Sequence, residues 1–137
     1  MSPPHPAINL PTYSMPTRVL LAASGIWALA AGLIWAAVTW PIGGAAIGIL
    51  GPLSGVIVGG SSMGCDWLVR PWKKRNTLQW MNLWILHEAG RITASLGVLI
   101  LLYFAFSPSP AAFLFSYLFC ALATLLATTR TWTKGMR

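Results

Sequence analysis

The chain has 137 residues, of which 56% are hydrophobic and only 8% are charged. Soluble domains average about 25% charged residues, so this composition excludes an ordinary water-exposed surface, and its hydrophobicity excludes intrinsic disorder. The net charge is +7, but nine basic residues are too few to line a nucleic-acid groove. The composition therefore predicts an all-α integral membrane protein with no nucleic-acid partner.

Residues 1–17 contain five prolines, which predicts an irregular N-terminal segment. The membrane domain is expected over residues 18–132, followed by a short basic tail at 133–137. Four apolar stretches long enough to cross the hydrocarbon core follow in chain order, with Pro41 and the Ser107–Pro110 breaker as stops. They predict four transmembrane helices in two hairpins, at about 19–40, 42–69, 78–106 and 111–129. The first stretch exceeds a signal-peptide core, so we expect it to be retained.

The basic residues predict the orientation. Eight of the nine lie before the first span, between the second and third, or after the fourth. With four spans, all three of these places face the same side. The positive-inside rule makes that side cytoplasmic, so both termini are expected there. The loop residues Arg70, Lys73, Lys74 and Arg75 form a cationic tip suited to anionic lipid or a partner protein.

Two further features concern the membrane boundary. Several tryptophans, Trp80 and Trp132 among them, are expected to be interfacial anchors near the basic side. The stretch 78–106 would extend about 43 Å as a helix, so residues 60–69 and 78–87 are expected at the cytoplasmic interface or beyond it.

Glycines recur at intervals of four in the second apolar stretch. Small residues at this spacing form a flat stripe against which another helix packs closely. The stripe indicates packing within the chain, against the first or third helix, or docking of a helix from another protein. Its members are Gly44, Gly48, Gly51, Gly55 and Gly59.

His87, Glu88 and Arg91 form a polar cluster inside the third span. Glu88 and Arg91 are three residues apart, so they share a helix face and can pair. Ionisable residues in lipid cost about 2.5–3.5 kcal/mol each and mark functional candidates. The cluster is also expected near the cytoplasmic boundary of the membrane, where Arg91 can extend toward the lipid headgroups. An interfacial or structural role is therefore as compatible with the sequence as a functional one.

Asp66, at the end of the second helix, is the only other acid. Asp66 and Glu88 could approach each other across the helix 2–3 hairpin and hold Mg²⁺ with waters, or could pair with nearby cations, which we favour. The pair His87-Glu88 also begins like the zinc-binding helix motif of metalloproteases. Arg91 stands at the position of the second histidine of that motif, so a zinc-protease site is excluded. No nucleophile–base set or cysteine pair motif is present, so we expect no enzymatic activity.

This layout resembles the ATP synthase subunit I family of small four-helix bacterial membrane proteins. That family carries a pattern close to Gly-Glu-Ala-x-Lys in its third helix, before an aliphatic run. Here the segment reads His87-Glu88-Ala89-Gly90-Arg91, with Arg91 in place of the lysine and His87 in place of the glycine. The resemblance implies a multi-pass protein of the bacterial inner membrane that assists assembly of the c-subunit rotor ring of F-type ATP synthase, with Mg²⁺ handling as an associated role.

A small ion transporter or channel is the alternative, with Glu88, Arg91 and Asp66 along its pathway. Four helices with so few polar groups make a thin pathway unless several copies form an oligomer.

Overall fold

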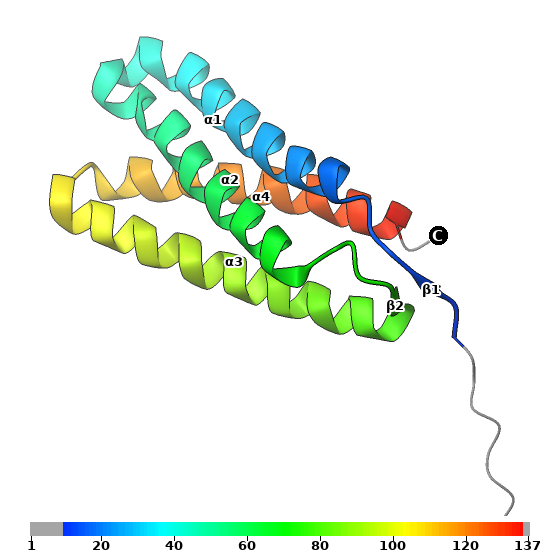
Figure 1. The fold of residues 1–137 in the computed structure, drawn as a ribbon. Coiled ribbons are helices and arrows are strands. Elements are labelled where there is room, and N and C mark those ends of the chain that lie inside the picture. Colours follow the sequence, from blue (N-terminus) through cyan, green and yellow to red (C-terminus); the bar gives the residue numbers. More distant parts are fainter. Residues whose placement is uncertain (1–9, 136–137) are drawn as a thin grey trace, which may run out of the picture.

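The computed structural model describes residues 10–135 as four helices and one short strand pair (Figure 1). Three helices, α1, α3 and α4, are long and apolar enough to cross a membrane, which supports the predicted class of multi-pass helical membrane protein. The helices are α1 (Thr17–Gly48), α2 (Leu50–Val69), α3 (Thr77–Phe106) and α4 (Pro110–Gly135), and the strands are β1 (Thr12–Tyr13) and β2 (Arg75–Asn76).

The turn between α1 and α2 lies later in the chain than expected. Helix α1 continues through Pro41 and breaks at Gly44, whose φ of 73° and ψ of −176° strongly favour glycine over residues with a side chain. Helix α2 consequently begins at Leu50 instead of Ile42. The chain therefore turns where glycine permits the turn, not where proline removes a hydrogen bond.

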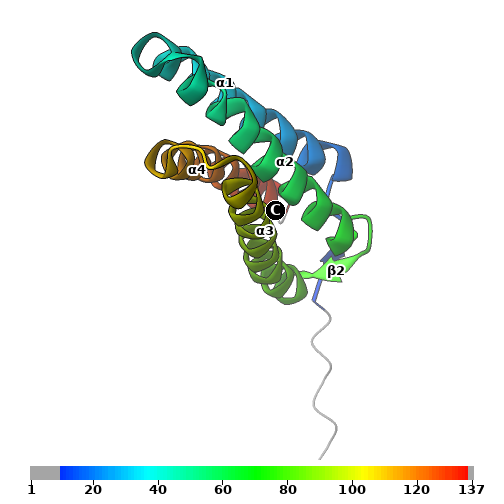
Figure 2. The same cartoon turned by 90° about the vertical axis from the view of Figure 1, so that its left-hand side faces the viewer.

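Helix α2 is the centre of the bundle. It packs against α1, α3 and α4, and Figure 2 shows α1 and α3 on opposite sides of it. Its buried positions include Ser54, Ser62 and Asp66 alongside several glycines. Helix α2 is not among the three candidate spans, and these small and polar residues, which face its neighbours, account for its lower hydropathy.

The glycine stripe divides into two parts. Gly51, Gly55 and Gly59 face α1, where a Cβ atom added to Gly55 would lie 2.7 Å from the carbonyl oxygen of Ala28. This part brings the two backbones together within the chain, as small residues do between membrane helices. Gly44 and Gly48 belong to the end of α1 and its break, so they take no part in the α2 packing surface.

The described part of the N-terminal segment is ordered against the end of the bundle. Strands β1 and β2 pair antiparallel, with Thr12 opposite Asn76. The Met15 amide donates to the Pro71 carbonyl at 2.9 Å, and the Met15 side chain is buried. The expectation of an irregular segment is therefore wrong for Thr12 and Tyr13, which form a strand, while residues 14–16 have no regular secondary structure and are held by the Met15 contacts. Residues 1–9 lie outside the described part.

Trp80 and Trp132 are core residues and not interfacial anchors. Their side chains are only 0% and 1% exposed, and their rings pack edge to face with centroids 5.5 Å apart. The Trp80 indole donates to the Tyr13 carbonyl at 3.0 Å. Trp80 and Trp132 form one buried cluster with Met15, Leu20 and Val69. This apolar core closes the basic end of the bundle.

Candidate functional site

A buried ion pair lies at the centre of the polar cluster predicted in the third helix. Arg91 donates to Glu88 Oε2 from Nη2 at 2.6 Å and from Nε at 3.0 Å. The pair forms within one turn of α3, as its spacing predicts. Arg91 is 3% exposed and Glu88 9%, so both side chains are enclosed by the bundle.

His87 joins this pair to α2. Its Nδ1 lies 3.3 Å from Glu88 Oε1, and its Nε2 lies 2.8 Å from Asp66 Oδ1. The Asp66 contact has ion-pair distance but not hydrogen-bond alignment. Asp66 and Glu88 therefore do not meet directly, since the imidazole ring of His87 stands between the two carboxylates.

The same cluster reaches the two remaining helices. The Ser24 hydroxyl of α1 donates to Asp66 Oδ2, and Arg91 Nη1 donates to the Ala121 carbonyl of α4 at 3.4 Å. We call the five side chains the ionic network: Ser24, Asp66, His87, Glu88 and Arg91. It contacts all four helices, and both acidic residues of the sequence belong to it. The Glu88–Arg91 pair lies within α3. The contacts of Asp66 with Ser24 and His87, and the contact of Arg91 with the Ala121 carbonyl, join different helices, so these contacts help to fix how the helices sit together.

Mg²⁺ does not fit this arrangement. Among the described residues, no group of three or more His, Cys, Asp or Glu side chains is placed to hold a metal ion. The guanidinium of Arg91 and the ring of His87 already contact the Glu88 oxygens. Mg²⁺ requires octahedral oxygen coordination, and these cation donors occupy the directions from which it would bind. Of the two uses considered for Asp66 and Glu88, the structure shows side-chain pairing.

Two further polar pairs cross the bundle beyond the network. The hydroxyls of Ser95 on α3 and Tyr117 on α4 lie 2.8 Å apart. Those of Ser54 on α2 and Ser116 on α4 lie 2.7 Å apart, and all four side chains are buried. These pairs join helices without charge.

Sequence reasoning did not identify Ser24 or Tyr117. Ser24 is a single serine within a long apolar run, and such an isolated polar residue in a membrane helix is a signal for an interhelical contact. Tyr117 carries a weaker signal, because a tyrosine near a helix end is equally typical of an interface.

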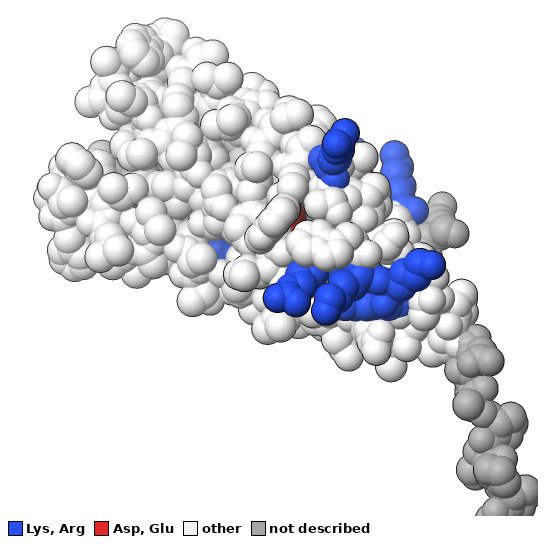
Figure 3. All heavy atoms as spheres, in the orientation of Figure 1, with Lys and Arg blue, Asp and Glu red and all other residues white. Residues whose placement is uncertain are grey.

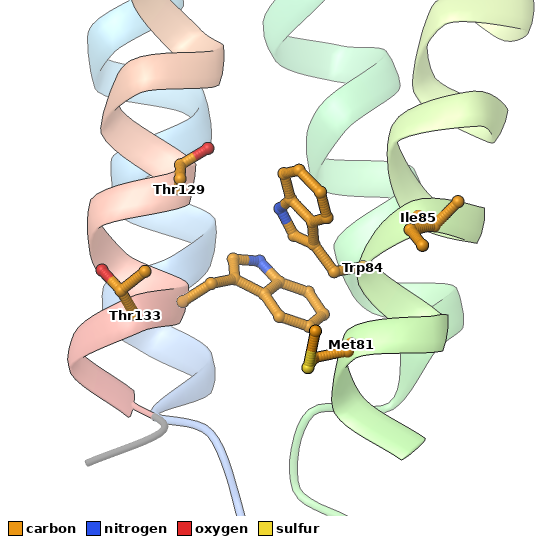
Figure 4. A pocket seen from close by; sticks show the side chains of 6 residues that line it. Met81, Trp84, Ile85, Thr129 and Thr133 are labelled. Atoms are coloured by element: carbon orange, nitrogen blue, oxygen red, sulfur yellow. The ribbon is translucent and has the colours of Figure 1, made fainter. Parts of the chain in front are cut away.

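An apolar pocket of about 230 Å³ lies beside the network, between α3 and α4 (Figure 4). Met81, Trp84 and Ile85 line it from α3, and Thr129, Trp132 and Thr133 line it from α4. Trp132 also packs on His87, with ring centroids 5.8 Å apart. No charged side chain lines the pocket, and Trp132 is a lining residue that also contacts the network through His87.

Exposed lysine and arginine side chains gather at one end of the molecule (Figure 3). Arg70, Lys73 and Lys74 of the α2–α3 loop are exposed there. Arg75 is instead held in place, because its Nη1 donates to the Val69 carbonyl at 2.7 Å and its guanidinium lies 5.0 Å from the Trp80 ring centroid. Three of the four predicted contact residues are therefore available to a ligand.

Together, these features define a small multi-pass helical membrane protein with an internal ionic network and a basic end. No protein-family model matches the chain. Comparison with curated proteins and with solved structures gives no match either.

Proposed function

We propose that this chain is a non-catalytic accessory protein of the bacterial inner membrane, with four spans and both termini in the cytoplasm. The gathering of exposed basic residues at one end supports the orientation, through the positive-inside rule. Helix α2 has 20 residues, enough to cross the hydrocarbon core if its polar face is covered by α1, α3 and α4.

The closed ionic network is the observation that carries the proposal. Every charged side chain within the described helical interior contacts another member of the network. A catalytic acid or base must reach a substrate, and these side chains are enclosed by the bundle. Their role in this proposal is therefore to position the helices. Glu88 and Arg91 therefore orient α3 and its loop instead of contacting a partner themselves.

We further propose that the partner is the c-subunit ring of an F-type ATP synthase, whose assembly this chain assists. The support is the resemblance of residues 87–91 to the third-helix pattern of the subunit I family. In this chain that segment supplies three of the five network residues. Since α1 already covers Gly51, Gly55 and Gly59, contact with c subunits falls to the exposed apolar side of α3 and to the basic loop.

Deletion of the gene tests this proposal through the yield of assembled c-ring. The proposal predicts less c-ring on native gels at unchanged c-subunit synthesis, with recovery when the wild-type chain is supplied. Unchanged ring yield and unchanged ATP synthesis in the deletion strain would refute the assembly role.

A small ion transporter remains the second candidate. The Ser95–Tyr117 and Ser54–Ser116 pairs favour it, because with the network they place polar groups at several depths of the bundle. This candidate predicts that purified protein in liposomes conducts an ion and that Glu88→Gln abolishes conduction. The accessory role predicts no conductance above that of protein-free liposomes.

A further inference from the structure

A groove of about 390 Å³ runs between α1 and α4 toward the basic end of the bundle. Trp27 lines it from α1, and Ala123, Leu126 and Ala127 line it from α4. Trp27 is 55% exposed and Leu126 63%, so the floor of the groove is apolar and open to the surroundings. Arg130 and Lys134, on the last turns of α4, form its charged end.

These two cations have no acidic partner among the described residues. The sequence contains only two acids, and both Asp66 and Glu88 are buried in the ionic network. Arg130 and Lys134 are exposed, and like charges four residues apart on a helix repel each other. An external anion placed between them relieves that repulsion.

The shape of the groove specifies what kind of anion fits. From Arg130 to Ala123 the helix descends about 10 Å along an apolar surface within a candidate membrane span. A ligand that fills the groove must therefore carry negative charge at one end and hydrocarbon along the rest. Basic pockets between membrane helices recognise anionic lipid head groups in this way.

We propose that this groove binds an anionic glycerophospholipid, with its phosphate on Arg130 and Lys134 and an acyl chain along Trp27 and Leu126. An acidic protein segment would satisfy the cations but would leave the apolar floor uncovered in the bilayer.

The test is native mass spectrometry of the purified full chain with phosphatidylglycerol or phosphatidylcholine carrying identical acyl chains. We expect phosphatidylglycerol to be preferred, and we expect Arg130→Gln and Lys134→Gln each to lower that preference about fivefold. Arg18→Gln is the matched control. It removes the same charge from an exposed arginine that does not line the groove, and it should leave the preference almost unchanged.

A second variant tests the apolar part of the groove. Ala127→Trp fills the floor while leaving both cations in place, and it should reduce retention of phosphatidylglycerol to the level of phosphatidylcholine. Equal losses for Arg18→Gln and Arg130→Gln would overturn the proposal, because surface charge alone would then explain binding. If glycerol phosphate, which lacks acyl chains, bound as well as phosphatidylglycerol, the site would be a phosphate site and the proposal would be overturned. The proposal would also be overturned if the wild-type chain showed no preference for phosphatidylglycerol over phosphatidylcholine.

Discussion

Replacing Arg91 by methionine removes the cation that neutralises Glu88 inside the bundle. Two charge-assisted hydrogen bonds, at 2.6 and 3.0 Å, are lost together with the contact to the Ala121 carbonyl. Breaking a buried ion pair from one side costs about 3–5 kcal/mol. Because His87 still contacts Glu88, we expect the lower limit, a loss of about 3 kcal/mol in the free energy of unfolding.

The double variant Glu88→Met/Arg91→Met separates the pair from its individual charges. Replacing both members of a buried ion pair by apolar side chains is often close to neutral, so the double variant should lose no more than about 2 kcal/mol. Unfolding in dodecylmaltoside with increasing sodium dodecyl sulfate, followed by far-ultraviolet circular dichroism, measures these values. Arg18→Met, at an exposed arginine, should change the free energy by less than about 0.5 kcal/mol.

Additive losses in the double variant would refute this reasoning, because they would show that Glu88 and Arg91 do not stabilise each other. A loss for Arg91→Met no larger than that for Arg18→Met would refute the claim that the pair is buried.

Three other predictions concern packing, the chain turn and orientation. Gly55→Ala should destabilise the protein by about 1–3 kcal/mol, because the added Cβ would meet the Ala28 carbonyl. Gly60→Ala should stabilise it by about 0.5–1 kcal/mol, because nothing lies within 4 Å of a Cβ at that position. The same detergent titration tests both, and equal effects would contradict the close approach. Gly44→Ala should cost about 1–3 kcal/mol because of its backbone conformation, and a neutral effect would place the turn elsewhere. A Lys74→Cys variant lacking the native cysteines should react with a membrane-impermeant maleimide in inverted vesicles and not in intact cells; the reverse pattern would overturn the proposed orientation.

Interactions within one helix could be predicted from the sequence. The Glu88–Arg91 pair follows from a spacing of three residues, because helix geometry alone places the two side chains on one face. The Asp66–His87 contact could not be derived in this way. It depends on how α2 and α3 are rotated about their axes, and many packed residues of both helices determine that rotation.

The positions of the tryptophans could not be predicted from the sequence either. An indole with an apolar body and one N–H donor suits both a membrane interface and a buried site with a hydrogen-bond acceptor. Trp80 finds that acceptor in the Tyr13 carbonyl, which the β1–β2 pairing brings to it. A strand pair of two residues on each side leaves almost no pattern in the sequence, so the burial of Trp80 could not be foreseen.

The most direct test of the account uses c-ring yield to separate a structural role of the ionic network from a chemical one. A strain lacking the gene would be complemented with the wild-type chain, with Arg91→Met, or with Glu88→Met/Arg91→Met at matched expression. If the network positions helices for an assembly role, the double variant should restore more assembled c-ring than Arg91→Met does. A double variant as defective as the single, although stably folded in the membrane, would contradict the account and favour ionic chemistry as the function of the site.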